Sequence, residues 1–376
     1  MLLTPHGAMV RQPKGYKPRE RSSRPLVSGR AKGALPPAKP YPLPEKKEGG
    51  WYIPPPQSLR LHQKSAFGFR CNDEGILLTP VELLYCHWYR FIPLPEPKAA
   101  WFAANMEAEP QFEAQAIAME LMRTSHDLCV PVVHLTHRMG RLPSMTWALG
   151  WPRGSPWMKT SPATQIRVQR TADDVDWFEL LNWFDEVSDQ GQQAMLCVID
   201  DEMEGTVYAL CEHHPSGEHR TLSSLSTEEW HRIEASLNLA VVSDTVAYLP
   251  HVEDWPLPSI GVEHFSGRTL GLMEHIMLRD EQPLDIGRAS LQRWLIEQGL
   301  MLRPGFKYGS LWRAYERPIG EEHAPWLIQP VELAPSTWDG VCLAARLAEG
   351  VHKTWLCAFP QHAGDGWRML SIARRS

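Results

Sequence analysis

Residues 299–315 read GLMLRPGFKYGSLWRAY, and two further stretches with their own mixture of aromatic, basic and small residues follow. Residues 322–328 read EHAPWLI, in which Pro325 opens a predicted strand, and residues 346–354 read RLAEGVHKT. A helix is predicted over 337–349 because apolar residues recur there at i, i+3, i+4 and i+7. These apolar residues are Trp338, Val341, Cys342 and Ala345.

In this order, the three stretches resemble the catalytic domain of the tRNA-splicing endonucleases, or tRNA-intron lyases, of archaea and eukaryotes. That family has a helix, an Arg-x-Gly-x-Lys-Phe/Tyr-Gly motif, a strand ending in Val-Tyr, then His-Ala and an Arg-Lys-Thr-like segment. The resemblance covers residues 255–376 well and 60–214 more loosely. Several spaced motifs in the right order are specific where each alone is weak. His352 departs from the pattern, because many relatives have arginine beside the lysine.

The resemblance implies an active site of Tyr315, His323 and Lys353. A histidine, with an ordinary pKa near ~6.5, suits the general acid that protonates the leaving 5′-oxygen. A lysine suits the cation that stabilises the phosphorane-like transition state. The general-base role of Tyr315 follows from the resemblance alone. Singly, a strand-end tyrosine, a loop histidine and a helix-end lysine are ordinary structural residues, so the interpretation depends on all three together.

The implied function is removal of introns from precursor tRNA at bulge–helix–bulge sites, leaving a 2′,3′-cyclic phosphate and a 5′-hydroxyl, with no metal or cofactor. Arg346 and Arg368 match a guanidinium pair that the family uses to sandwich a flipped base. They also suit an exposed helix arginine and an edge-strand charge. The rival functions are a non-catalytic RNA-binding or scaffold subunit, and a different metal-independent ribonuclease that needs no bulges.

The chain repeats parts of its own pattern, which predicts a duplicated domain. Residues 75–85 and 265–278 both read as a short strand, a turn and the start of a helix. A second set of segments also matches, and from its helix through its last strand the offset stays at 159 to 161 residues. The matched segments are 156–158 with 325–327, 176–187 with 337–349, Gly191 with Gly350, and 195–198 with 355–358.

The first copy is predicted to be non-catalytic. Aligned through Trp147 with Trp312 and through 156–157 with 325–326, Tyr315 faces Gly150, His323 faces Gly154, and Lys353 faces Gln193. None of the three residues in the first copy can act as an acid, a base or a cation.

An acidic turn distinguishes the first copy from the second. It consists of Asp200, Asp201, Glu202, Met203 and Glu204, where the second copy has 360–365. In the family an acidic loop at this place inserts into a basic pocket of a neighbouring subunit, so the resemblance implies a homodimer with two active sites. A plain acidic β-turn is the alternative.

The predicted fold is α+β, a tandem duplicated unit in which each copy has a small α/β subdomain followed by a nuclease-like mixed sheet. The predicted divisions are a disordered basic tail (1–58), a degenerate repeat (59–214), an ordered connector (215–252) and a catalytic repeat (253–376). The tail contains twelve of the 33 prolines, which disfavour helices and inner strands. Residues 1–50 have eleven Lys/Arg and three Glu, a net charge of +8. The remaining residues therefore have a net charge of −14, which gives −6 for the whole chain.

The composition is that of a globular protein, with 43% hydrophobic and 22% charged residues. The seven scattered cysteines include no CxxC pair, which favours reduced thiols in a cytoplasmic protein, or a nuclear one if the source is eukaryotic. No apolar run approaches the ~18 residues of a membrane span. We therefore expect precursor tRNA and a second copy of the chain as partners, and no membrane.

Overall fold

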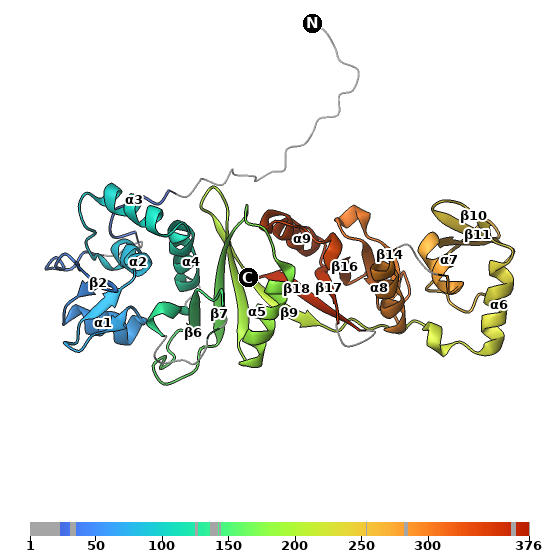
Figure 1. Cartoon of the computed structure of the whole chain (residues 1–376), viewed down its shortest axis with the longest axis horizontal. Coiled ribbons are helices and arrows are strands. Elements are labelled where there is room, and N and C mark those ends of the chain that lie inside the picture. The colour runs from blue at the N-terminus through green and yellow to red at the C-terminus, as the bar shows by residue number, and fades with distance from the viewer. Residues whose placement is uncertain are drawn as a thin grey trace, which may run out of the picture.

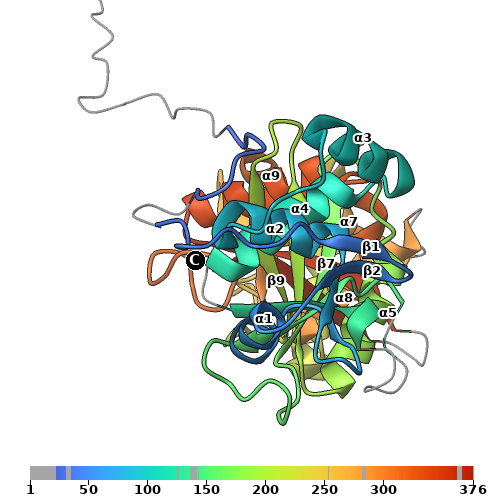
Figure 2. The same cartoon turned by 90° about the vertical axis from the view of Figure 1, so that its left-hand side faces the viewer.

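The computed structural model is an elongated molecule with a large sheet in the middle and a small sheet at each end (Figure 1). It describes residues 23–30, 35–124, 127–135, 142, 144–252, 254–281, 285–361 and 366–375. Viewed along its longest axis, the molecule has a much smaller outline (Figure 2). This is a mixed α+β protein with several sheets, as the sequence predicts.

The central sheet has ten strands, five from each half of the chain, in the order β14-β15-β16-β17-β18-β9-β8-β7-β6-β5. The halves meet where β9 and β18 pair antiparallel. The strands of the first half are β5 (Asp127–Pro131), β6 (Ala148–Pro152), β7 (Thr164–Arg170), β8 (Gln193–Ile199) and β9 (Gly205–His213). Those of the second half are β14 (Met301–Pro304), β15 (Trp312–Tyr315), β16 (Trp326–Pro330), β17 (Thr354–Pro360) and β18 (Trp367–Arg374).

The two halves of this sheet have the same strand order and directions. Each contains one parallel pair, β7 with β8 and β16 with β17, joined through a helix. These helices are α5 (Trp177–Asp189) and α9 (Trp338–Gly350), which confirms the two helices predicted from apolar spacing. Their descent from one duplicated unit stays a prediction.

The register of the strands corrects the alignment made from the sequence. Helix α5 and strand β8 correspond to α9 and β17 at a constant offset of 161 residues, because Trp177 matches Trp338 and Gln193 matches Thr354. The predicted match of 156–158 with 325–327 is wrong. Trp157 lies in a turn before β7, buried against Trp151 at 6.0 Å between ring centroids, so its apolar character comes from local packing.

Each half also has a small four-stranded sheet, with orders β1-β2-β4-β3 and β10-β11-β13-β12. In the first half the elements are β1 (Glu45–Lys47), β2 (Gly50–Ile53), α1 (Gln57–Ser65), β3 (Phe69–Arg70), β4 (Ile76–Leu78), α2 (Pro80–Arg90), α3 (Lys98–Ala108) and α4 (Phe112–Thr124). In the second half they are α6 (Thr227–Leu237), β10 (Val241–Val242), β11 (Val246–Pro250), β12 (Val262–His264), β13 (Gly267–Gly271), α7 (Leu272–Leu278) and α8 (Ile286–Glu297).

Residues 215–252 are not a connector between two units, contrary to the sequence-based division. Strand β11 pairs antiparallel with β13, with Val246 opposite Gly271, and β10 pairs with β11. The segment therefore supplies two of the four strands of the second small sheet. Helix α6 packs on the same sheet through Ile233 and Leu237, which lie in one core with Leu270. The reason for the error is physical: strand partners far apart in sequence leave no local signal.

The predicted disordered tail (1–58) is also too long. Among its described residues, 45–53 form the β1–β2 hairpin, and α1 begins at Gln57. Upstream, the Arg30 guanidinium lies 4.9 Å from the Trp88 ring centroid, and Arg24 forms an ion pair with Glu120 at 2.8 Å. Charged side chains thus hold this segment on the first half without apolar periodicity. Residues 1–22 and 31–34 lie outside the described residues.

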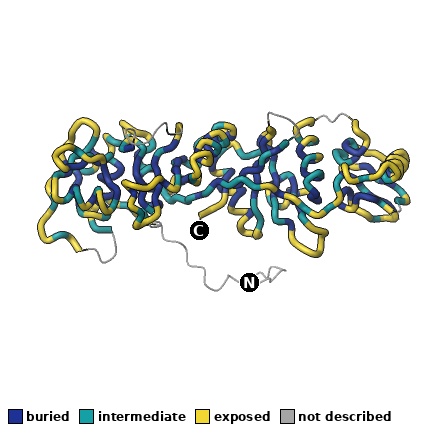
Figure 3. The backbone as a smooth tube through the Cα atoms, turned by 90° about the horizontal axis from the view of Figure 1, so that it is seen from below, coloured by how far each residue is buried: buried dark blue, intermediate teal, exposed yellow. Residues whose placement is uncertain are grey.

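Helices α5 and α9 share one core on one face of the central sheet, which includes Leu210 of β9 and Ile372 of β18. Residues from both halves are therefore buried together at the β9–β18 pair. Buried backbone follows the sheet through the centre of the molecule, and exposed segments lie at the periphery (Figure 3). None of the helices in the described part of the chain is long and apolar enough to cross a bilayer.

Candidate active site

The β14–β15 hairpin places Tyr315 at a strand end. Residues 305–309 turn the chain between the strands: the N–H of Gly305 donates to Leu311 O at 2.9 Å, and Gly309 has φ +67°. A left-handed residue without a Cβ closes such a turn at low steric cost. Tyr315 then pairs with Met301 across the hairpin and is 8% exposed.

His323 lies in the loop between β15 and β16. The next residue, Ala324, is buried in a small cluster with Met301 and Tyr315. The His323 side chain is exposed, and among the described residues it has no hydrogen-bond partner. Its loop is anchored by Trp326, whose Nε1 donates to Glu316 Oε1 at 2.8 Å.

Lys353 reaches the same point from the other side of β16. Its N–H donates to Ala348 O at 2.9 Å, and its Nζ donates to Ala324 O at 2.5 Å. The chain turns before it through His352, which has φ +55°. Ala324 therefore links the three predicted catalytic residues: it follows His323, packs with Tyr315, and accepts the bond from Lys353. The structure brings all three positions together.

Several cations surround this point, of which sequence analysis identified only Lys353 as a site residue. The Arg313 guanidinium lies 5.7 Å from the ring centroids of both Tyr308 and Tyr315, and Lys353 Nζ lies 5.8 Å from that of Tyr308. Burial, followed by the nearby charge of Arg313, lowers the pKa of Lys353. The signal for Arg313 was its position two residues before Tyr315, on the same face of a strand.

The comparison with known proteins agrees with this geometry. Residues 288–367 match the family of the tRNA intron endonuclease, catalytic C-terminal domain. The match begins in α8 and ends at the first residue of β18, so it contains the hairpin, the loop and Lys353. A stretch of 68 residues is also 40% identical to the tRNA-splicing endonuclease of Methanopyrus kandleri. That alignment covers 18% of this chain and 37% of the relative's length.

Arg346 and Arg368 have different surroundings. Arg346, inside the range that matches the family, is exposed on α9. Arg368 lies one residue beyond the matched range and is held by the first half. Its guanidinium donates to Asp185 at 2.7 and 2.8 Å and to Glu212 at 2.7 and 3.0 Å. These carboxylates raise the pKa of Arg368 and occupy its donors.

The acidic turn joins β8 to β9 in the first half. The Asp200 carboxylate accepts from the N–H groups of Glu202 at 2.9 Å and Glu204 at 2.8 Å, so this residue closes the turn. The guanidinium of Arg24 donates to Met203 O at 2.6 Å. The N-terminal segment of the same chain therefore contacts this turn, which the sequence did not predict. Asp201 and Glu202 are exposed.

The first half has no counterpart of the catalytic set, although the positions differ from those predicted. Strand register matches Tyr315 with Trp151, and the offset of 161 matches Lys353 with Gln192. The loop 153–163, which corresponds to that of His323, contains no histidine. The predicted counterparts Gly150 and Gln193 are each one residue out of register. Gly150 was aligned by matching Trp147 with Trp312, whereas the strand pairs match Trp312 with Ala148.

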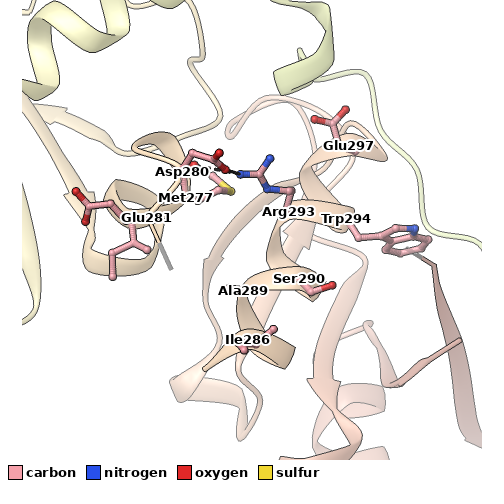
Figure 4. A pocket seen from close by; sticks show the side chains of 10 residues that line it. Met277, Asp280, Glu281, Ile286, Ala289, Ser290, Arg293, Trp294 and Glu297 are labelled. Atoms are coloured by element: carbon pink, nitrogen blue, oxygen red, sulfur yellow. Dashed lines mark hydrogen bonds and ion pairs between the residues drawn. The ribbon is translucent and has the colours of Figure 1, made fainter. Parts of the chain in front are cut away.

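A cavity of about 620 Å³ lies outside the predicted site, between α7 and α8 (Figure 4). Its lining includes Met277, Ile286 and Trp294, and its arginine, Arg293, forms an ion pair with Asp280 at 3.2 Å. Among the described residues, no three His, Cys, Asp or Glu side chains are grouped so that they could hold a metal ion.

Proposed function

We propose that this chain is a tRNA-splicing endonuclease that cleaves precursor tRNA at bulge–helix–bulge sites. The observation that carries the proposal is the convergence at Ala324, the residue after His323. Its carbonyl accepts a hydrogen bond from Lys353 Nζ, and its side chain packs with Tyr315. The family match over residues 288–367 supports the same reaction class. The Methanopyrus relative is named as an enzyme of this kind.

The reaction is an internal transfer at phosphorus. Tyr315 accepts the proton of the ribose 2′-hydroxyl, and the 2′-oxygen forms a bond to the adjacent phosphorus. The bond from phosphorus to the 5′-oxygen breaks, and His323 supplies the proton to this leaving group. Lys353 stabilises the added negative charge of the transition state, with Arg313 close to Tyr315. The products are a 2′,3′-cyclic phosphate and a 5′-hydroxyl, and no metal takes part.

We further propose that two chains form the working enzyme, with one active site in each second half. The first half has Trp151 and Gln192 where the second has Tyr315 and Lys353. Its role is then assembly, through an acidic turn with Asp201 and Glu202 exposed to a second copy. The shared strand order of the two halves supports descent from one duplicated unit.

The test is cleavage of a bulge–helix–bulge precursor tRNA in EDTA by the wild type and by His323→Ala. We expect cleavage at both bulges by the wild type and a rate about 10²–10⁴-fold lower in the variant, the usual contribution of general acid catalysis. RNA binding without cleavage by either protein would favour a scaffold subunit. Equal cleavage by both would refute the site, and cleavage of a bulge-free strand would favour a different ribonuclease.

A further inference from the structure

The β9–β18 pair has two equivalent ends, related by an approximate two-fold axis. Cα partners run from His213 with Met369 at one end to Tyr208 with Arg374 at the other. Residues of β9 correspond to residues of β18 at an offset of 162, because Met195 pairs with Ala209 as Leu356 pairs with Ser371. The axis therefore passes through the pair Leu210 and Ile372.

The two ends carry opposite charges. At the first, Asp185 and Glu212 hold Arg368. The offsets of 161 for the helices and 162 for the strands place Arg346 at the position of Asp185, Arg374 at that of Glu212, and Thr206 at that of Arg368. The second end thus has two arginines where the first has two carboxylates, and no acid where the first has its arginine.

These two arginines flank Tyr208. Arg374 is its partner across the strands, and Arg346 lies one helical turn after Cys342, with which the buried Tyr208 side chain hydrogen-bonds. Burial raises the pKa of Tyr208, and the charges of both arginines oppose that shift. The side chains of Arg346 and Arg374 are exposed, and neither forms an ion pair within the described part of the chain.

A cavity of about 270 Å³ opens beside this end and leads to Lys353. His352, Lys353 and Arg374 contribute to its wall, and of the described residues that line it only Glu349 is acidic. A site with several cations and one exposed acid favours an anion, and guanidinium groups bind phosphate through two parallel N–H donors.

We propose that Arg346 and Arg374 bind a backbone phosphate of the RNA strand that passes Lys353. This inference rests on the proposed function and deepens it: the RNA-binding arginine pair is Arg346 with Arg374, and Arg368 is a structural residue between the halves. Along β18, Arg368 and Arg374 are six residues apart, about 20 Å at strand rise, so one phosphate cannot contact both ends.

The experiment measures binding of a labelled bulge–helix–bulge RNA at several salt concentrations. Arg346→Ala and Arg374→Ala are each expected to weaken binding about tenfold, and Arg374→Lys less. The double variant should lower the slope of log affinity against log salt by about 1, because the two arginines neutralise one phosphate. Arg232→Ala, which removes an exposed helix arginine from α6, is the matched control and should bind as the wild type does.

Thermal unfolding and gel filtration accompany each binding measurement. Weaker binding and a smaller salt slope, at unchanged melting temperature and elution, support the inference. Unchanged binding in the double variant overturns it while leaving the proposed function intact, provided that the wild type cleaves. A change of elution together with the loss of binding also overturns it, because the arginines would then hold an acidic protein surface. A wild type that neither binds nor cleaves this RNA would sink the proposed function itself.

Discussion

At the scale of single residues, the candidate site depends on one lysine with two neighbours of different kinds. Lys353 has its ammonium on the Ala324 carbonyl and a second cation, Arg313, nearby. Burial removes water from the ammonium, and the charge of Arg313 repels it, so these two causes disfavour the protonated form. The proposed reaction needs that protonated form.

The pH profile of cleavage should report this lysine. With its pKa lowered, Lys353 loses its proton at a lower pH than an ordinary lysine, so activity should fall on the alkaline side before pH ~10.4. Lys353→Arg should retain some activity and move this alkaline limb upward, since a guanidinium stays protonated. Lys353→Ala should lower kcat about 10²–10³-fold, as loss of a transition-state donor does. An alkaline limb unchanged in Lys353→Arg would assign the titration to another group.

Arg368 gives a prediction about stability. Arg368→Ala removes a guanidinium that is 22% exposed and leaves Asp185 and Glu212 as neighbouring like charges. We expect the free energy of unfolding to fall by about 1–3 kcal/mol, within the range between exposed and buried ion pairs. The measurement is denaturant unfolding, with Asp185→Asn and the double variant completing a cycle. Additive losses in the cycle would mean that the two side chains do not interact.

The residue scale is also where sequence reasoning was most informative. Tyr315, His323 and Lys353 were chosen by motif, and the structure brings them to one point. The arginine pair was not predictable in this way. Whether Arg368 faces RNA or a carboxylate depends on Asp185, a residue 183 positions away. No motif encodes such a contact.

At the scale of elements, the turns decide where the site residues lie. Gly309 closes the hairpin before Tyr315 in a left-handed conformation, whereas Gly350 ends α9 with open space around its Cβ position. The helices were predictable because their apolar residues recur locally. The strand register of the first half was not predictable from the sequence. Trp157, buried in a turn, resembles Trp326, which begins β16.

Two glycine substitutions test the difference between the left-handed Gly309 and the helical Gly350. Gly309→Ala should destabilise the fold by about 1 kcal/mol, because an L-residue at φ +67° is strained. Gly350→Ala should be neutral or stabilise by about 0.5 kcal/mol, since alanine orders more easily in a helix and meets no neighbour there. Chemical denaturation of both variants checks the pair. Equal effects would mean that the hairpin turn relaxes without cost.

At the scale of the whole molecule, the halves form one sheet, and their boundaries differ from those predicted from the sequence. Strands β10 and β11 belong with β13, and residues 45–53 belong with β4. Both errors concern pairing between distant segments, which depends on tertiary contact rather than on composition.

Assembly can be tested at the acidic turn. Asp201→Lys with Glu202→Lys reverses two exposed charges and should shift elution from a dimer toward a monomer, with loss of RNA cleavage, if this turn docks on a second copy. Glu228→Lys, an exposed acidic residue of α6, is the control and should elute as the wild type. Multi-angle light scattering gives the mass. A dimer that survives the reversal would exclude the turn as the contact.

The antiparallel pairing of β9 with β18 gives the first half a protective role that needs no chemistry. Standing alone, the second half would present β18, eight residues long, as a bare strand edge. Such an edge recruits strands from other molecules and seeds aggregation. The first half covers this edge within the same polypeptide, so its backbone keeps β18 from pairing with other molecules.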